Sequence, residues 1–378
     1  MQNALQNAVT YHYGKFPPQT LSYEALLDPV FQTGNALSRY DQMLAAMHNS
    51  EILLAPLRNQ EAVASSRMEG TVSTLDEVLR IEAEVSEDSD AAFRQARSEA
   101  VETFLYSRAL QRIQREIEAG RPLSEFLIRQ AHQILLSFGR GAHLTPGAYK
   151  TDQNYVGERR RHSVSFVPIS PEALPSGMQS LMNFIRDGQM NPLLKTAIAH
   201  VEFEALHPFK DGNGRIGRML ITLMLWTSGL IRQPHFYVSA YFERYRDDYI
   251  DMMRRVSAED DWTGWCLFFL QGIRDQAEHN IIVADRIFAL YEAMKLRFRE
   301  ELKSEWAIEA LDFMFANPSF KNNKFTAHDR IPAHVAASMT RKLREVGILS
   351  QIQPGAGQRP AIYGFKPLID IIRDETEV

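Results

Sequence analysis

Apolar residues recur at helical spacing along most of the chain. Residues up to about 40 lack this pattern and contain the breakers Pro17, Pro18 and Pro29, so we expect them to be irregular. From about residue 37 to residue 63, apolar side chains return every three or four positions, which predicts helical structure. Further helices are expected over 92–119, 123–138, 171–186, 192–206, 214–229, 240–257 and 260–298.

Residues 140–170 have a different character. Glycine and proline residues punctuate two short apolar runs, 154–156 and 164–167, and a polar cluster at 158–162 lies between them. Two such runs joined by a polar turn predict a β-hairpin within an otherwise helical protein.

The chain from about Ser304 onward reads as a separate domain. Two short amphipathic helices, near Leu311 and over 335–343, are expected before two strands, 348–352 and 361–365, joined by a glycine-rich turn at 354–359. Helices followed by a hairpin resemble a winged helix-turn-helix domain.

Composition narrows the class of protein. A length of 378 residues suggests two or three domains, and 45% hydrophobic with 24% charged residues is typical of a globular chain. A net charge of -5 argues against bulk binding to nucleic acid, and the single cysteine, Cys266, excludes an intramolecular disulfide. The N-terminus lacks the features of a signal peptide, and the apolar segment 219–231 is too short to span a bilayer. We therefore expect a soluble, cytoplasmic protein with no membrane partner.

The residues 207–218, HPFKDGNGRIGR, carry the clearest chemical signal. Pro208 disfavours helical geometry at His207, so the preceding helix should end there and present the imidazole. Gly212, Asn213 and Gly214 tolerate backbone angles that most residues avoid. A helix then begins, and its unpaired N–H groups face the loop.

Such a loop suits the binding of phosphate groups. Arg215 and Arg218 lie three residues apart on one helix and can reach the same anion. Asp211 offers a hard oxygen ligand for Mg²⁺, and His207 can act as a general base near neutral pH. The sequence therefore predicts a base, a metal ligand and an anion site in one loop.

Other interpretations of this region stay open at this point. A glycine-rich helix start is a weak signal by itself, and a single histidine at a helix end is more often a cap or a packing residue. The stripe His200, Glu204, His207 and Asp211 has near-helical spacing and could instead hold a metal ion, although Pro208 interrupts it. The standard P-loop pattern is absent.

Residues 207–218 resemble the signature of the Fic family, H-P-F-x-[D/E]-G-N-G-R-x-x-R, at every defined position. Fic enzymes are helical and mostly transfer AMP from ATP to a hydroxyl side chain of a target protein. The resemblance implies that His207 deprotonates a Ser, Thr or Tyr hydroxyl and that Asp211 holds Mg²⁺ between two phosphates. It also implies a set of nucleotide-binding residues: Gly212, Asn213, Gly214, Arg215, Ile216, Gly217, Arg218 and Tyr249.

A second segment, Ser65 to Gly70, resembles the inhibitory motif [S/T]-x-x-x-E-[G/N] of that family. The resemblance implies that Ser65 and Glu69 form this motif, with Glu69 pairing Arg218 and blocking placement of the γ-phosphate. Alternatively, Glu69 is a solvated side chain and Gly70 ends its helix.

Two further segments extend the resemblance. The hairpin 149–168 is similar to the flap on which the family docks a target backbone by strand addition, and it places Asn154, Tyr155 and Val156 in that role. Residues 241–249 resemble the segment near the adenine, although these tyrosines could equally pack the helix.

We therefore expect a mainly α protein with a Fic-type helical core, a β-hairpin flap and a C-terminal winged helix-turn-helix domain. The expected function is auto-inhibited adenylyl transfer to a target protein, or to the chain itself, with ATP and Mg²⁺. Removal of AMP by the same site, with Glu69 orienting a water, is one alternative, and a DNA-binding regulator with a Fic-like sensor core is another. Homodimer formation is left open. The expected domains are an N-terminal region with the inhibitory helix (1–110), the catalytic core (111–300) and the winged helix (301–378).

Overall fold

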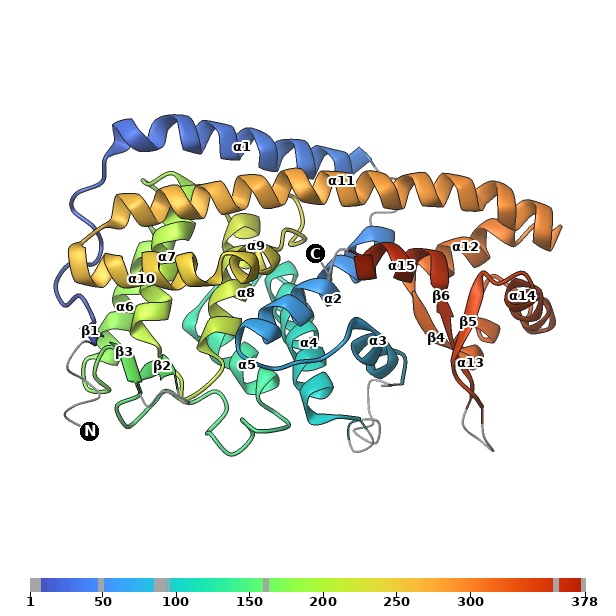
Figure 1. Ribbon diagram of the computed structural model, residues 1–378, viewed down its shortest axis with the longest axis horizontal. Helices are drawn as coiled ribbons and strands as arrows, with labels where there is room; N and C mark the ends of the chain where they lie inside the picture. Colours follow the sequence, from blue (N-terminus) through green and yellow to red (C-terminus); the bar gives the residue numbers. More distant parts are fainter. Residues whose placement is uncertain are drawn as a thin grey trace. The chain divides into compact units, whose positions relative to one another are not determined.

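The computed structural model describes residues 8–46, 51–84, 93, 96–158, 163–355 and 360–374, and these are mainly helical (Figure 1). They form two compact parts, each assembled from several chain segments. The first part comprises 1–42, 65–70 and 105–278, and the second comprises 43–64, 71–104 and 279–378. None of the helices in the described ranges combines the length and the hydropathy that a bilayer span requires.

The first part is a helical assembly around α7 and α8. Six helices of the described ranges lie wholly in it: α5 (Glu125–Leu135), α6 (Leu174–Arg186), α7 (Pro192–Leu206), α8 (Asn213–Thr227), α9 (Ser239–Arg244) and α10 (Arg246–Glu259). Four more in these ranges are divided between the two parts: α1 (Tyr23–Ala46), α2 (Glu51–Met68), α4 (Ser98–Glu118) and α11 (Trp262–Leu302).

Helix α7 is buried on almost every side. Asn191 caps its start, since the side-chain Oδ1 accepts a hydrogen bond from Leu193 N at 2.9 Å, and Pro192 occupies the first helical position, where no N–H is needed. A helix that is apolar all round belongs in a core. Helix α8 follows after six residues and is also buried over most of its length, so the loop between them lies on rigid supports.

The predicted hairpin is confirmed. Strands β2 (Val156–Glu158) and β3 (Ser163–Val167) pair antiparallel. The two-residue strand β1 (Val9–Thr10) adds in parallel to β3, which the sequence pattern did not indicate, so the order is β1-β3-β2. Among the described strands, β2 is therefore an edge of this sheet.

The second part contains α3 (Leu75–Glu84), α12 (Ala307–Ala316), β4 (Ser319–Lys321), α13 (Asn322–Thr326), α14 (Ala333–Glu345), β5 (Leu349–Gln353), β6 (Ile362–Phe365) and α15 (Lys366–Asp374). Its strands pair in the order β4-β6-β5. Both predicted strands are present, while α3, β4, α13 and α15 were not anticipated. The interpretation as a winged helix stays a prediction, and residues 356–359 of its turn, with Arg359, lie outside the described residues.

Two expectations about helix boundaries are wrong. The N-terminal region is not irregular up to residue 40, because α1 begins at Tyr23 and contains Pro29. Leu26, Leu37 and Tyr40 of this helix are buried, so burial of one side outweighs the lost hydrogen bond at the proline. The segment expected as one helix over 240–257 is divided at Tyr245 into α9 and α10.

Candidate functional site

His207, the first residue of the loop 207–213, has a backbone conformation in the left-handed helical region. This residue has a φ of 46° and a ψ of 60°, and its N–H donates to Phe203 O at 3.0 Å. Helix α7 therefore ends at Leu206, and His207, the residue before Pro208, lies outside it, as the restriction imposed by the proline predicts. The imidazole is carried on a left-handed backbone position that only the surrounding structure can hold.

Two asparagine side chains fix the loop backbone. Asn213 accepts from Phe209 N and donates to Phe209 O, both at 2.8 Å. Asn154, from the segment before β2, donates to His207 O and to Phe209 O, both at 3.0 Å. The family resemblance implies a target-docking role for Asn154, whereas in the structure its amide donates both hydrogen bonds to the loop.

His132 on α5 supports the other side of the loop, and no sequence pattern indicated it. Its Nδ1 accepts from Gly147 N at 2.8 Å, which leaves Nε2 to donate to Asp211 O at 3.0 Å. The ring stacks on Phe209 with centroids 3.7 Å apart. Burial lowers the pKa of His132 to about 4, so the ring stays neutral and keeps both hydrogen bonds at neutral pH.

Lys150 is a buried cation beside His207. Its ammonium donates to Asn154 Oδ1 at 2.7 Å and to Leu206 O at 3.1 Å, and burial lowers its pKa to about 7. Lys150 therefore joins the hairpin segment to the end of α7, directly before the catalytic histidine of the predicted site.

His207 is held as a neutral imidazole. Burial, and then the charge of Lys150, lower its pKa to about 4. Its Nδ1 lies 3.3 Å from Glu204 O, and because a carbonyl only accepts, Nδ1 carries the proton in this contact. Nε2 is then the nitrogen with the lone pair, as a general base requires.

The start of α8 presents positive charge next to His207. Gly212 precedes the helix with a φ of 77°, and the N–H groups of the first turn face outward from it. Arg215 is 1% exposed, yet its Nε and Nη1 atoms are buried without a hydrogen-bond partner. Asp211 Oδ1 lies 3.9 Å from Arg215 Nη2 and accepts from Gly212 N at 2.7 Å. A buried guanidinium with unused donors is a strong candidate for binding an anion.

Arg218, one turn further along α8, already donates hydrogen bonds to other residues of the chain. It donates to Ser65 Oγ at 2.9 Å, to Ser65 O at 2.8 Å and to Glu69 Oε1 at 2.7 Å. The Arg218 side chain is 2% exposed. Burial by itself would raise the pKa of Glu69, but the charge of Arg218, its hydrogen bond and the charge of Arg215 together lower it. Glu69 is therefore an ionised partner of Arg218.

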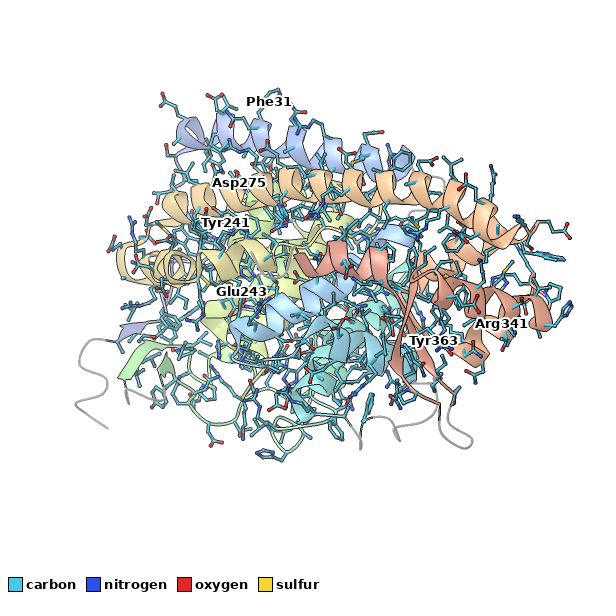
Figure 2. All side chains as sticks on the ribbon, turned by 45° about the vertical axis from the view of Figure 1, so that its right-hand side comes forward. Phe31, Tyr241, Glu243, Asp275, Arg341 and Tyr363 are labelled. Atoms are coloured by element: carbon cyan, nitrogen blue, oxygen red, sulfur yellow. The ribbon has the colours of Figure 1, made fainter. Side chains whose placement is uncertain are left out.

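The segment around Glu69 has a second anchor. Arg67 lies 2.7 Å from Glu243 on α9, whose side chain is labelled in Figure 2. Gly70 then ends the helical turn with a φ of 77°. An added side chain at Gly214 would come within 2.1 Å of Glu69 Oε1, so the carboxylate lies directly against the start of α8.

Glu204 on α7, which the sequence suggests only as a metal ligand, has a half-buried side chain that lines a cavity. Its Oε1 has no hydrogen-bond partner and rests against Gly217, where a Cβ atom would be 2.2 Å away. Burial raises the pKa of Glu204 to about 8, so it is protonated at neutral pH. The neighbouring His200 donates from Nδ1 to Gly217 O and holds the Tyr249 hydroxyl at 2.8 Å with Nε2.

These contacts argue against the alternative in which His200, Glu204, His207 and Asp211 hold a metal ion. Both ring nitrogens of His200 are in use, and within the described ranges no three His, Cys, Asp or Glu side chains gather as a metal site. Two other predicted nucleotide-binding residues have buried side chains, and the Tyr249 hydroxyl lies close enough to Arg218 to interact with its charge. Tyr249 is buried in the core against His200, and Ile216 faces an apolar gap beside Leu127 while its N–H donates to Gly212 O.

A cavity of about 540 Å³ opens beside His207. The hairpin, α7 and α10 line it, so three elements of the first part meet there. Its walls carry apolar and charged side chains: Val156, Phe166, Val201, Glu204, Ile250, Met253, Arg246, Asp247, Asp251 and Arg254. Its volume and mixed walls suit a small organic ligand with polar groups.

Comparison with known proteins gives this geometry its context. Residues 122–225 match the model of the Fic/DOC family, and residues 28–113 match that of the Fic/DOC family N-terminal region. The chain belongs to the Fic/DOC family. The helical fold and the 207–218 loop of the Fic chain agree with the resemblance seen in the sequence.

Curated relatives share parts of this Fic chain. A protein adenylyltransferase of Caenorhabditis elegans is 32% identical over 105 residues, which cover 27% of this chain and 19% of the relative. A probable protein adenylyltransferase of Aquifex aeolicus is 28% identical over 198 residues, 51% of this chain and 57% of the relative. The chain thus spans about a fifth to somewhat over half of these relatives.

Solved structures show the same fold. A Fic family protein from Desulfovibrio desulfuricans G20 aligns with a TM-score of 0.58 at 20% identity, over 93% of this chain and 98% of that protein. A C. elegans Fic-1 structure aligns with a TM-score of 0.53 at 18% identity, over 69% of this chain and 74% of the other.

Proposed function

We propose that this Fic protein is an auto-inhibited protein adenylyltransferase that transfers AMP from ATP to a Ser, Thr or Tyr hydroxyl of a target protein, or of its own chain. The observation that carries the proposal is the buried guanidinium of Arg215, unpartnered at Nε and Nη1, in the first turn of α8, directly after the loop that carries the neutral imidazole of His207. An anion site and a base are the two elements that nucleotidyl transfer needs.

The chemistry follows from this placement. His207 Nε2 takes the proton of the target hydroxyl as its oxygen attacks the α-phosphorus of ATP. A new P–O bond forms to the target, the bond between the α-phosphorus and the bridging oxygen breaks, and pyrophosphate leaves. Arg215, the N–H groups of the first turn of α8 and, once released, Arg218 neutralise the phosphate charge.

Asp211 fits the role of a magnesium ligand. Its side chain is 40% exposed at the loop, and a carboxylate there needs no further protein ligand, since Mg²⁺ commonly takes one or two carboxylates together with phosphate oxygens and water. The ion would supply charge neutralisation between phosphates when bound.

The cavity next to His207 suits the nucleoside of ATP. It adjoins the loop, and Val156, Ile250 and Met253 offer apolar surface for a base. The exposed edge of β2 lies on the same hairpin and can accept a target backbone as an added strand.

Inhibition is proposed to come from Glu69. The Glu69 carboxylate binds the Arg218 guanidinium, which would otherwise contact the γ-phosphate of ATP. The ionised carboxylate would also repel the negative charges of a triphosphate brought close to it. Loss of Glu69 should therefore release Arg218 for the nucleotide.

The test is incubation of the full chain with ATP labelled at the α-phosphate. Glu69→Gly should raise protein labelling at least about tenfold, the factor for roughly 1.4 kcal/mol of released interaction, whereas Glu118→Gly on the exposed end of α4 should not. Adding His207→Ala to Glu69→Gly should abolish labelling while ATP still binds. Equal labelling of wild type and Glu69→Gly refutes auto-inhibition, and undiminished labelling without His207 refutes its role as the base.

Removal of AMP is a second candidate, favoured by the ionised state of Glu69 at the anion site. A carboxylate there can accept a proton from water as the water attacks the phosphorus of a modified hydroxyl. Release of AMP from a labelled target by wild type, and not by Glu69→Gly, would identify this activity.

A further inference from the structure

An exposed apolar ridge runs along the N-terminal half of α1. Tyr23, Leu27 and Phe31 lie four residues apart, hence on one side of the helix, and are 62%, 71% and 74% exposed. Figure 2 shows Phe31 on the outer side of α1. Several large apolar side chains exposed in one row mark an interaction site more often than isolated ones do.

The fold does not need this ridge, because a different side of α1 packs on the first part. Leu26, Leu37 and Tyr40 are at most 1% exposed, and Tyr40 donates to His235 O at 2.7 Å. Thr33 donates to Leu270 O of α11 at 3.0 Å, consistent with the two helices lying side by side in Figure 1.

The same exposed side of α1 carries shorter, polar residues in its C-terminal half. Asn35 and Ser38 are exposed there and continue the row that Phe31 begins. Large side chains at one end and short ones at the other make the surface complementary in shape to its own antiparallel copy. With a two-fold axis near residue 33, Phe31 of each copy meets Asn35 of the other, because both lie two residues from the axis. The Asn35 amide then faces an aromatic ring, which accepts weakly from N–H groups.

Two charged residues on the exposed side of α1 also suit an antiparallel pair of helices. Asp28 is exposed in the N-terminal half and Arg39 in the C-terminal half, and neither has an ionic partner among the described residues. Eleven residues separate them, about 16 Å along the helix at 1.5 Å per residue, so they cannot pair within one copy. Eleven residues are also close to three turns, so both lie on one edge, and the two-fold axis brings Asp28 of each copy to Arg39 of the other.

We propose that α1 is a homodimer interface in which two copies of this chain pair antiparallel through Tyr23, Leu27 and Phe31 and through two Asp28–Arg39 ion pairs. The three large side chains offer roughly 400 Å² of apolar surface per copy, given 150–250 Å² for a fully buried aromatic residue. That is about half of the roughly 800 Å² per partner in a stable interface, and the flanking polar residues supply the rest. The proposal does not depend on the enzymatic activity.

Sedimentation of the full chain over concentrations from about 0.1 to 50 μM tests it. The wild type should be a dimer in the upper part of this range. Phe31→Glu should raise the dissociation constant at least about 100-fold, because both copies lose a central aromatic anchor and bury a charge instead. Phe126→Glu on α5, a residue 62% exposed outside the ridge, is the matched control and should leave the constant unchanged.

A charge exchange tests the antiparallel register. Asp28→Arg and Arg39→Glu should each weaken the dimer by about three- to tenfold, and the double variant should recover most of the loss because both pairs form again in reverse. A monomeric wild type at the highest concentration overturns the proposal, whatever else binds the ridge. A dimer indifferent to Phe31→Glu, or a double variant as weak as the two losses combined, overturns it as well.

Discussion

The Glu204 carboxyl lies where a side chain at position 217 would begin: a Cβ atom added to Gly217 would be 2.2 Å from Glu204 Oε1. With an alanine at 217, the Glu204 carboxyl would have to move, and His200 Cε1, 3.3 Å from the added Cβ atom, is the next neighbour. Gly217→Ala should lower the free energy of unfolding by about 1 kcal/mol in denaturant titration, because the cost of overpacking is partly offset by movement of the flexible Glu204 side chain and by the higher helix propensity of alanine. Gly188→Ala, where an added Cβ meets nothing within 4 Å, is the control, and equal stability of the two variants would contradict the contact.

The protonation of Glu204 should make ATP binding depend on pH. Burial holds its pKa at about 8, so a rise from pH 7 to 9 adds a negative charge beside Arg218 and the proposed nucleotide site. The dissociation constant for ATP should increase roughly fivefold over this range, as expected for about 1 kcal/mol of repulsion.

Calorimetric titration of ATP into wild type and Glu204→Gln separates this effect from the loss of charge at Lys150, whose pKa is about 7. Lys150 titrates in both proteins, whereas the carboxyl titrates only in the wild type. Identical pH profiles would mean that Glu204 has no part in binding.

Ser65 should contribute to inhibition separately from Glu69. Its hydroxyl accepts from Arg218 Nε at 2.9 Å, and a hydrogen bond to a charged group contributes about 1.5–3 kcal/mol. Ser65→Ala should raise labelling by only about three- to tenfold, which corresponds to about 0.7–1.4 kcal/mol and is below the effect of Glu69→Gly, because Arg218 keeps its contacts to Ser65 O and Glu69. Ser66→Ala is a matched control, since Ser66 is equally buried and its hydroxyl has no partner. The same increase in both variants would rule out a specific role for the Ser65 hydroxyl.

Asn154 should position the reacting loop without binding nucleotide. Asn154→Ala removes hydrogen bonds to His207 O and Phe209 O, and a misplacement of about 1 Å can cost roughly 100-fold in rate. In a Glu69→Gly background we expect kcat to fall about 10- to 100-fold while the dissociation constant for ATP changes less than about threefold. Thr151→Ala, which removes only an exposed contact to Asp152, serves as the control. A change confined to ATP affinity would refute the positioning role.

The sequence located the loop because its chemistry is contiguous. His207, Asp211 and Arg215 lie within nine positions, and Pro208 and Gly212 set the backbone between two helices. The residues that support the loop could not be found this way. His132 is 79 positions from Asp211, and its partner there is a main-chain carbonyl, which leaves no trace in residue type. Lys150 likewise acts through its burial, which one sequence does not reveal.

Some element boundaries could not be predicted for the same reason: they depend on packing between segments that are far apart in the sequence. Pro29 indicated irregular structure, but the packing of Leu37 and Tyr40 on the first part stabilises α1 through the proline. Strand β1 has two residues and exists only because β3 offers it a partner, so no periodicity marks it. Conversely, the α8 start and the hairpin were predicted because glycine and proline fix their ends locally.

The bonds from Arg218 to Ser65 and Glu69 join positions 153 and 149 residues apart. A ribosome makes and releases the N-terminal portion first. Glu69 is thus synthesised well before Arg218, so the carboxylate is already present when α8 first forms. At no stage of its synthesis does the chain contain Arg218, part of the proposed anion site, without already containing Ser65 and Glu69, to which that arginine bonds.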